Sequence, residues 1–242
     1  MDQIKCELQA SFGDDKFIAE SAWTSSLDYQ KKQSRTDQDV ARVVQMLATA
    51  RHSTPFESII FRFWMRIPIT IDRQLMTHRL QSASGMSGRY RTMPNDYLEP
   101  SDDINIITAK LPQERFVQLS NGTQIYGMDD MIERYFEVCE SANNAYSQII
   151  AIAKDSEKKN KITNAEFKRI REFYRGMLPQ HNMTERVTTM NLRSFANFIK
   201  LRNSEHAQPE IKHLAELMLK EVKNKAKCPI AIEFLEKNKW EL

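Results

Sequence analysis

Hydrophobic and polar positions alternate strictly in a few short segments of this chain, and that period predicts strands. The clearest segment spans residues 59–67, where every second residue is large and apolar and Arg62 and Arg66 fall between them. The apolar positions are Ile59, Phe61, Phe63, Met65 and Ile67. We therefore expect a strand with one buried face, ended by Pro68. Residues 184–190 are predicted to form another strand, and residues 5–10 an edge strand.

Most of the remaining apolar residues recur at helical spacing. In the first half of the chain we expect helices at residues 16–24, from the cap Asp37 to about Ala50, and from the cap Thr70 to His78 and Arg79. A long helix is expected to open at Asp129 or Asp130, and another to span residues 164–177. The last two are expected to start at the cap Asn191 and at Pro209, the latter closed by Lys227, Cys228 and Pro229. Residues 154–161 are highly charged, so we expect a solvated loop there.

The size and charge of the chain limit the classes of protein to which it can belong. Its 242 residues fit a single domain, residues 1–242, with a substantial core. The net charge is only +3 although 28% of the residues are charged. This balance argues against an extended nucleic-acid-binding surface, while a local basic pocket is compatible with it.

Targeting and metal-binding patterns are not found in the sequence. No apolar run approaches the roughly 18 residues of a membrane helix, and residues 1–13 lack the apolar stretch of a signal peptide. We therefore expect a cytoplasmic protein that does not bind membranes. The cysteines Cys6, Cys139 and Cys228 are far apart, and the five histidines include no His-Glu-x-x-His pair. The sequence predicts neither a disulfide framework nor a zinc site.

Residues 74–90 combine small residues with arginines in a pattern that suits an anion. Gly85 and Gly88 can adopt positive φ and let backbone N–H groups approach a ligand, while Arg79 and Arg89 offer guanidinium groups that suit phosphate. Neither a Walker loop nor a dinucleotide-binding G-x-G-x-x-G is present. A phosphate-binding loop and a solvated Ser/Gly connector are both consistent with this spacing.

Two further polar clusters accompany this loop. Thr54 and Glu57 lie in a turn around Pro55, and several arginines, asparagines and histidines follow Arg175. On the predicted helix over residues 164–177, Arg171 and Arg175 share one face. A solvated basic face is an ordinary alternative for this helix.

The order of these clusters resembles the flavin-dependent thymidylate synthases. That family has the signature Arg-His-Arg-x-x-Ser-x-x-x-x-Ser-x-Arg, and this chain has Thr77, His78, Arg79, Ser82, Ser87 and Arg89 in the same frame. Other matching landmarks are His52 to Glu57, Arg171 to Pro179, Asn191 to Phe198, Leu201-Arg202 and Ser204 to Gln208. The resemblance covers most of the chain, and residues 99–161 match little.

The resemblance implies an α+β fold in which helices surround a twisted, mostly antiparallel sheet. It implies a homotetramer that binds FAD and a pyrimidine deoxynucleotide where subunits meet. The family methylates C5 of dUMP with the one-carbon unit of methylenetetrahydrofolate, and NADPH reduces the flavin. None of the three cysteines lies in a cluster that would activate it as a nucleophile, which agrees with a route that depends on a cofactor instead.

The resemblance also assigns roles to individual residues. Those expected at the flavin are Thr54, Glu57, His78, Arg79, Asn191, Arg193, Asn197, Leu201 and His206. Those expected at the nucleotide are Gln74, Ser87, Gly88, Arg89, Arg175 and Arg202. Arg202 is the expected catalytic residue, because a fixed cation beside the N3/O4 edge of uracil stabilises the negative charge that develops there.

The chain departs from the family at two places. Thr77 replaces the first arginine of the signature, and Ser84-Gly85 replaces the Asn-Glu of many members. A roomier pocket of this kind could hydroxymethylate dUMP, dCMP or UMP instead of methylating dUMP. A non-catalytic nucleotide-binding protein and a catalytically degraded subunit are also consistent with these departures.

Overall fold

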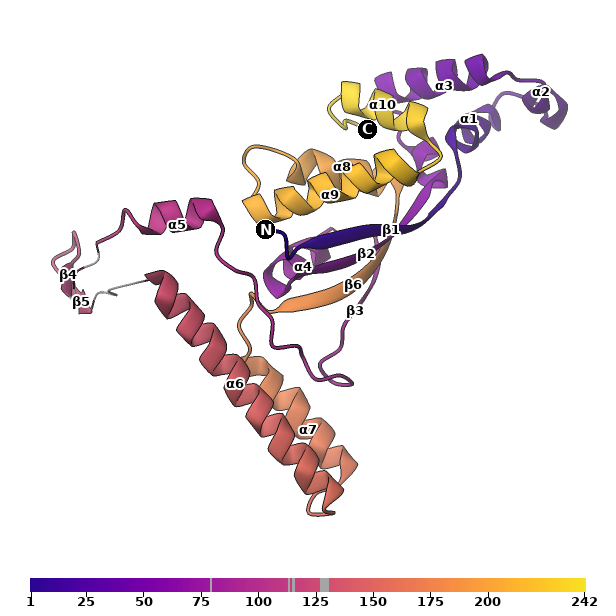
Figure 1. Ribbon diagram of the computed structural model, residues 1–242. Helices are drawn as coiled ribbons and strands as arrows, with labels where there is room; N and C mark the ends of the chain where they lie inside the picture. The colour runs from indigo at the N-terminus through magenta and orange to yellow at the C-terminus, as the bar shows by residue number, and fades with distance from the viewer. Residues whose placement is uncertain (79, 113, 115, 127–130) are drawn as a thin grey trace. The chain divides into compact units, whose positions relative to one another are not determined.

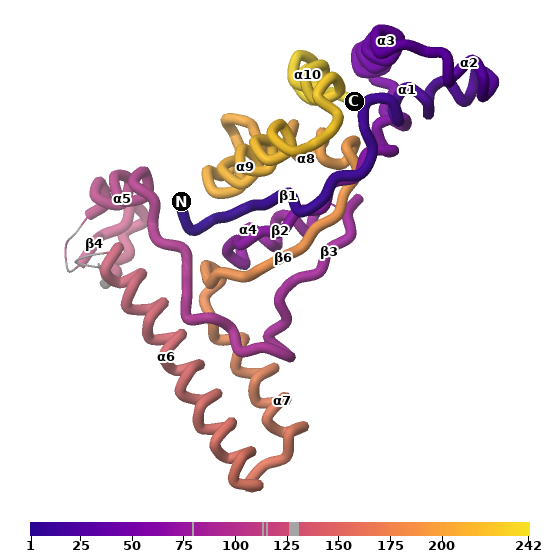
Figure 2. The backbone as a smooth tube through the Cα atoms, turned by 45° about the vertical axis from the view of Figure 1, so that its right-hand side comes forward, coloured from indigo at the N-terminus to yellow at the C-terminus, as the bar shows by residue number. Residues whose placement is uncertain are grey.

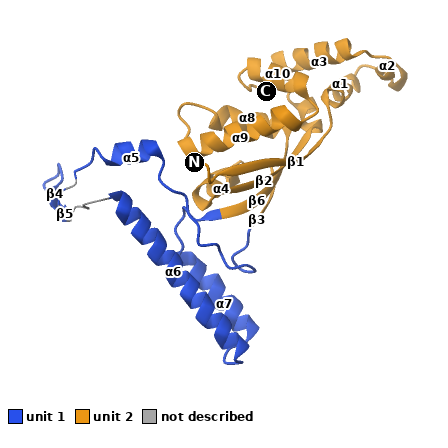
Figure 3. Cartoon of the chain, in the orientation of Figure 1, with its two compact units in different colours: residues 1, 86–183 blue, residues 2–85, 184–242 orange. Residues whose placement is uncertain are grey.

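The computed structural model describes the chain except residues 79, 113, 115 and 127–130. It divides into two compact units, which Figure 3 shows in different colours. The sheet unit comprises Asp2–Gly85 and Thr184–Leu242, and the insert unit comprises Met1 and Met86–Met183. The insert unit therefore interrupts the sheet unit along the sequence. The expectation of one domain over residues 1–242 is not tested by this division and stays a prediction.

A four-stranded sheet organises the sheet unit, in the order β1 (Lys5–Phe12), β2 (Ile60–Pro68), β6 (Met183–Asn191), β3 (Ser82–Gly85). β1 pairs antiparallel with β2, and β3 pairs antiparallel with β6. The predicted α+β class and mostly antiparallel sheet are confirmed. β1 lies at an edge of the sheet, as its sequence predicted.

The buried face of β2 forms the centre of the core. All five alternating apolar residues predicted from residues 59–67 are fully buried. Phe61 and Phe63 contact the ring of Phe195 on α8, with centroid distances of 5.4 and 5.9 Å. Helices α8 (Leu192–Arg202) and α9 (Pro209–Lys225) lie on the same side of the sheet in both views (Figures 1 and 2). The strict alternation of β2 thus fixes which side of the sheet these helices cover.

Three of the other helices of the sheet unit were predicted, with differences at their ends: α1 (Asp15–Trp23), α3 (Asp37–Thr49) and α4 (Ile69–Met76). The turn expected around Pro55 is the 3₁₀ helix η1 (Thr54–Ser58), and α2 (Tyr29–Gln33) and α10 (Pro229–Lys237) were not predicted. Asp37 was predicted to cap α3, but the cap is Thr36, which forms a capping box with Asp39. Thr70 was predicted to cap α4, but it lies inside the helix, which follows Pro68 without a side-chain cap.

Two predictions for the C-terminal third are confirmed, and one helix there was not predicted. Asn191 caps α8 as expected, since its side chain accepts a hydrogen bond from the backbone N–H of Ser194 at 2.8 Å. The helix predicted to start at Pro209 and to be closed by Lys227, Cys228 and Pro229 is α9, which ends at Lys225. The short helix α10, which begins at Pro229, was not predicted. Asp15 accepts hydrogen bonds from the backbone N–H groups of Ile230 and Ala231 and so satisfies the start of α10.

The insert unit is mainly helical. It contains α5 (Asp102–Thr108), the hairpin β4 (Phe116–Gln118) and β5 (Gln124–Tyr126), α6 (Met131–Lys158), α7 (Asn164–Tyr174) and η2 (Arg175–Met177). The solvated loop predicted at residues 154–161 is wrong, because α6 continues to Lys158 and Asp155 pairs with Lys159 across one helical turn. Asp129 and Asp130, predicted to open this helix, lie outside the described residues.

Within the described part of the chain, no helix is long and apolar enough to cross a membrane.

Candidate functional site

The predicted anion loop is split between the two units. Residues Ser82–Gly85 form β3, with Ser82 opposite Thr189 and Gly85 opposite Arg186, so this part is neither a phosphate loop nor an irregular connector. Neither Gly85 nor Gly88 has a positive φ, contrary to the conformational use predicted for them. Ser87 to Arg89 begin the insert unit.

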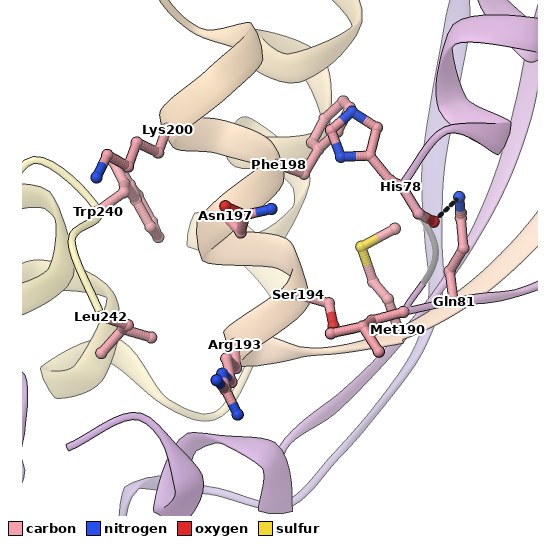
Figure 4. A pocket seen from close by; sticks show the side chains of 11 residues that line it. His78, Gln81, Met190, Arg193, Ser194, Asn197, Phe198, Lys200, Trp240 and Leu242 are labelled. Carbon is pink, nitrogen blue, oxygen red and sulfur yellow. Dashed lines mark hydrogen bonds between the residues drawn. The ribbon is translucent and has the colours of Figure 1, made fainter. Parts of the chain in front are cut away.

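A cavity of about 260 Å³ lies in the sheet unit beside the first turns of α8. Because Asn191 fixes the start of this helix, Arg193, Ser194 and Asn197 point from successive turns toward the same space. The lining residues are His78, Leu80, Gln81, Met190, Arg193, Ser194, Asn197, Phe198, Lys200, Trp240 and Leu242. In Figure 4, Asn197 lies between the His78 and Gln81 side of the cavity and the Lys200 and Trp240 side. Three of the residues predicted at the flavin are thus brought together here: His78, Arg193 and Asn197.

Within the described part of the sheet unit, His78, which is expected at the flavin, contacts Arg202, which is expected at the nucleotide. Arg202 Nε donates a hydrogen bond to His78 Nε2 at 3.1 Å. The ring of Phe198 contacts the imidazole edge-on at 5.1 Å. Burial and then the charge of Arg202 lower the pKa of His78 below its ordinary value of 6.5. His78 is therefore neutral near pH 7, with its proton on Nδ1, because Nε2 is the acceptor.

Glu57 reaches the cavity indirectly, through an ion pair. Arg193 Nη1 lies 2.5 Å from Glu57 Oε1, and the two side chains are 44% and 40% exposed. This pair fixes Arg193 relative to η1, although an exposed pair contributes little to stability. Thr54 lies at the start of η1 and lines a different cavity, of about 730 Å³, together with Arg51 and His52. The structure does not bring Thr54 to the cavity that holds His78.

The remaining residues predicted at the flavin have different positions. Asn191 acts as the cap of α8. Leu201 and His206 are exposed and do not line the cavity. Arg79 lies outside the described residues. The roles assigned to all of these residues stay predictions.

In the insert unit, the residues expected at the nucleotide phosphate lie together. Arg89 Nε donates to Glu172 Oε1 at 2.7 Å, and its backbone N–H donates to the hydroxyl of Ser87 at 3.3 Å. A Cβ on Gly88 would lie 2.9 Å from Cδ of Arg175, so glycine permits this close approach. Arg171 is buried and donates to the backbone carbonyl of Arg89. A buried arginine of α7 thus supports the backbone that presents Arg89. The alternative interpretation of a wholly solvated basic face on this helix is therefore wrong.

Gln74 and Arg202, the other residues expected at the nucleotide, belong to the sheet unit. Gln74 Nε2 donates to Gln208 Oε1 at 2.6 Å, which joins the end of α4 to the start of α9. Their expected convergence with Ser87, Gly88, Arg89 and Arg175 stays a prediction.

Sequence reasoning missed several residues at these sites. Gln81 Nε2 donates to the carbonyl groups of Leu75 and His78, which leaves its Oε1 buried without a partner beside the cavity. The hydroxyl of Ser194 is likewise buried and unpaired. Lys200 and Trp240 complete one wall. No signal singled out Gln81 or Trp240, whereas Arg171 lies within one of the family landmarks.

These features fit part of a flavin nucleotide. Gln81 Oε1 and Ser194 Oγ are buried polar atoms that need partners. Phe198 and Trp240 line the cavity with aromatic rings that are almost fully buried, and Arg193, which is paired with Glu57, adds a guanidinium group. Cavities for whole drug-sized ligands span about 300–1,000 Å³, so a cavity of about 260 Å³ can enclose only a portion of FAD. Among the described residues, no group of three or more His, Cys, Asp or Glu side chains could hold a metal ion.

Comparison with families of known proteins gives a match over most of the chain. A family model described as "Thymidylate synthase complementing protein" matches residues 7–229. The flavin-dependent thymidylate synthase of Kosmotoga olearia is 30% identical over 225 residues, which are 91% of this chain and 85% of that protein. The flavin-dependent thymidylate synthase of Rickettsia bellii is 31% identical over 216 residues, which are 87% of this chain and 69% of that protein.

Solved structures show the same fold. A UMP/dUMP methylase, PolB from Streptomyces cacaoi, bound with 5-Br UMP has a TM-score of 0.68 and 22% sequence identity, over 98% of this chain and 95% of PolB. Its structure with 5-Br dUMP has a TM-score of 0.66 and 21% identity, over 97% of this chain and 95% of PolB. At these identities the likeness shows a shared architecture.

Proposed function

This chain belongs to the thymidylate synthase complementing protein family, the flavin-dependent thymidylate synthases, and we propose that it methylates C5 of a pyrimidine nucleotide, with dUMP as substrate and dTMP as product. Methylenetetrahydrofolate supplies the one-carbon unit. Bound FAD, reduced by NADPH, supplies the hydride that completes the methyl group. The similar proteins of Kosmotoga olearia and Rickettsia bellii support the reaction class. PolB is described as a UMP/dUMP methylase, so UMP is a substrate to be tested beside dUMP.

The observation that carries this proposal is the pairing of Arg202 with a neutral histidine. Within the described residues, Arg202 has no carboxylate partner, and its Nε donates to His78 Nε2. Its charge is therefore not neutralised locally. A guanidinium group without a carboxylate partner stabilises the negative charge that develops at the N3/O4 edge of a uracil ring as C5 becomes nucleophilic.

The chain's other residues bind and orient in this proposal. Arg89 and Arg175 hold the nucleotide phosphate, and Ser87 adds a hydroxyl donor. His78, Arg193 and Asn197 hold part of FAD, together with Gln81 and Ser194, whose buried polar atoms are unpaired. Because the cavity of one chain encloses only a portion of FAD, a homotetramer in which neighbouring subunits complete the site accounts for the rest.

The cysteines support a route without a thiolate nucleophile. Burial raises the pKa of Cys6 and of Cys228 to about 12, and burial also raises the pKa of Cys139. A thiol with a raised pKa is protonated near pH 7 and is a poor nucleophile. The chemistry that other thymidylate synthases assign to an activated cysteine would have to come from a cofactor here.

The decisive experiment offers isotopically labelled dUMP, UMP and dCMP in turn to the purified protein with FAD, NADPH and methylenetetrahydrofolate. We expect mass spectrometry to find labelled dTMP from dUMP, and we expect Arg202→Lys to lose product while still binding FAD. A hydroxymethylated product would instead support the alternative suggested by Thr77, Ser84 and Gly85. Nucleotide binding without flavin uptake would overturn the enzymatic proposal.

A further inference from the structure

The last residues of the chain form a wall of the cavity that contains His78, Arg193 and Asn197. Trp240 and Leu242 both line it, and Figure 4 shows Trp240 beside Lys200. The family model matches the chain only through residue 229. This wall is therefore built from a segment beyond the matched part of the chain, and the family resemblance assigns no role to it.

A tight reversal after α10 brings this segment back to the cavity. Lys239 and Trp240 both have left-handed backbone conformations, with φ of 53° and 59°. The backbone N–H of Trp240 donates to the carbonyl of Leu235 at 2.7 Å, and that of Glu241 donates to Asn238 at 3.1 Å. Two consecutive non-glycine residues in this region are unfavourable, so side-chain contacts must hold the reversal in place.

Two kinds of contact hold it. The ring of Trp240 is only 7% exposed and meets Phe195 edge-on at 5.9 Å, which attaches it to the core. Glu241 pairs with Arg51 and with Lys200 of α8, the latter at 3.3 Å. The hydrogen bond from Lys200 and the charge of Arg51 lower the pKa of Glu241. The segment is thus fastened through the indole ring and through the carboxylate that follows it.

We propose that residues 239–242 act as a strap that completes the cofactor site: the part of the Trp240 indole that lines the cavity contacts a ring of the bound flavin nucleotide, and Glu241 is a positioning residue that holds the indole there. This inference rests on the proposed function for the identity of the ligand. The polar atoms of Gln81 and Ser194 lie in the same cavity, so the ligand meets hydrogen-bonding groups and the indole in one space. Aromatic pairs of this kind contribute affinity beyond the apolar area that they bury.

The test measures binding of FAD to the full-length protein, by flavin fluorescence and by quenching of tryptophan fluorescence. Trp240→Leu keeps an apolar side chain but removes the aromatic surface, and we expect its Kd for FAD to rise about tenfold. Trp240→Phe should recover most of this loss. Glu241→Gln leaves the indole intact and is expected to raise the Kd about threefold, because the strap is no longer fastened by charge.

Trp64→Phe is the matched control. Trp64 lies on β2 with its side chain on the face opposite Phe63 and Met65, away from the ring of Phe195 that Trp240 contacts. We expect this variant to keep both the wild-type Kd and the FAD-dependent quenching, whereas quenching should be largely lost in Trp240→Phe. Circular dichroism melts identify any variant that fails to fold, and Glu241→Gln tests the strap in that case.

The outcomes separate the strap from the proposed function. If the wild-type protein binds FAD and folded Trp240→Leu and Glu241→Gln bind it equally well, the strap proposal is wrong and the proposed function stands. If the wild-type protein binds no flavin nucleotide, both are wrong.

Discussion

The arginines of the insert unit and Arg202 of the sheet unit are held in opposite ways. Arg89 is paired with the carboxylate of Glu172, and Arg171 is buried against a backbone carbonyl. Arg202 instead donates to a neutral imidazole. A phosphate with its full negative charge can compete with one carboxylate for Arg89. A uracil ring develops only partial charge, and a carboxylate beside Arg202 would weaken the stabilisation of that charge. This difference fits the roles proposed for the two residues, phosphate binding for Arg89 and stabilisation of ring charge for Arg202.

Removing the unneutralised cation should have the largest effect. We expect Arg202→Gln to lower kcat by about 10²- to 10³-fold, as for the loss of one group that stabilises transition-state charge, with little change in the Kd for FAD. Steady-state kinetics and flavin fluorescence measure the two quantities. An equal loss in FAD binding would show that Arg202 supports the cofactor site rather than activation.

Crowding Arg175 should weaken nucleotide binding by a smaller factor. A Cβ on Gly88 would lie 2.9 Å from Cδ of Arg175, so Gly88→Ala must displace that side chain. We expect the Kd for dUMP to rise roughly tenfold, about 1.4 kcal/mol, as measured by isothermal titration calorimetry. Gly176→Ala is the control, because its Cβ would meet nothing within 4 Å. Equal effects of the two substitutions would contradict the role given to this contact.

Acid should weaken the Arg202–His78 contact, because it depends on a neutral imidazole. The pKa of folded His78 lies below its ordinary 6.5, so the contribution of the neutral form is fully present above pH 6.5 and is lost as the pH falls through the lower folded value. We expect kcat to fall several-fold on this acidic limb, and His78→Gln, which keeps an acceptor, to lack it. An NMR titration of His78 with a pKa of 6.5 or higher would contradict this account.

Releasing Arg89 from its carboxylate should have the smallest effect. Their side chains are 57% and 25% exposed, so Glu172→Gln is expected to leave the melting temperature nearly unchanged. The Kd for dUMP should fall about threefold, because the phosphate no longer competes with a carboxylate. Arg169 lies 3.8 Å from the same carboxylate and serves as the comparison, with Arg169→Gln expected to leave nucleotide binding unchanged. Weaker binding by Glu172→Gln would show that Glu172 positions Arg89 for the ligand.

Local patterns in the sequence correctly predicted those elements of secondary structure that are determined by a few neighbouring residues. The alternation in residues 59–67, the cap at Asn191 and the proline at the start of α9 all predicted structure that is present. Residues 154–158 were misread because charges on the solvated face of a helix resemble those of a loop. Ser82–Gly85 was not predicted as a strand because its pairing partner, β6, is about a hundred residues away.

The candidate site was predictable only where the family resemblance names residues. His78, Arg193 and Asn197 line one cavity as that grouping suggested. Lys200, Trp240 and Gln81 had no such signal, since their presence at the cavity depends on how α8, the end of α10 and the segment after α4 pack together. Tertiary packing of this kind leaves no short-range pattern in a single sequence.

The interruption of the sheet unit by Met86–Met183 has a consequence for how the chain acquires its structure. β6 lies between β2 and β3 in the sheet, yet the ribosome completes the whole intervening segment before it makes β6. Until then, β2 and β3 have unsatisfied edges that could pair with another nascent chain. The entropic cost of closing a loop grows only slowly with its length, by about 0.6 kcal/mol per doubling, so the long insertion lowers the final stability little. It slows folding more, because strands that are far apart in the sequence pair slowly. The strand order therefore leaves these edges open for longer during synthesis than a sheet of consecutive strands would.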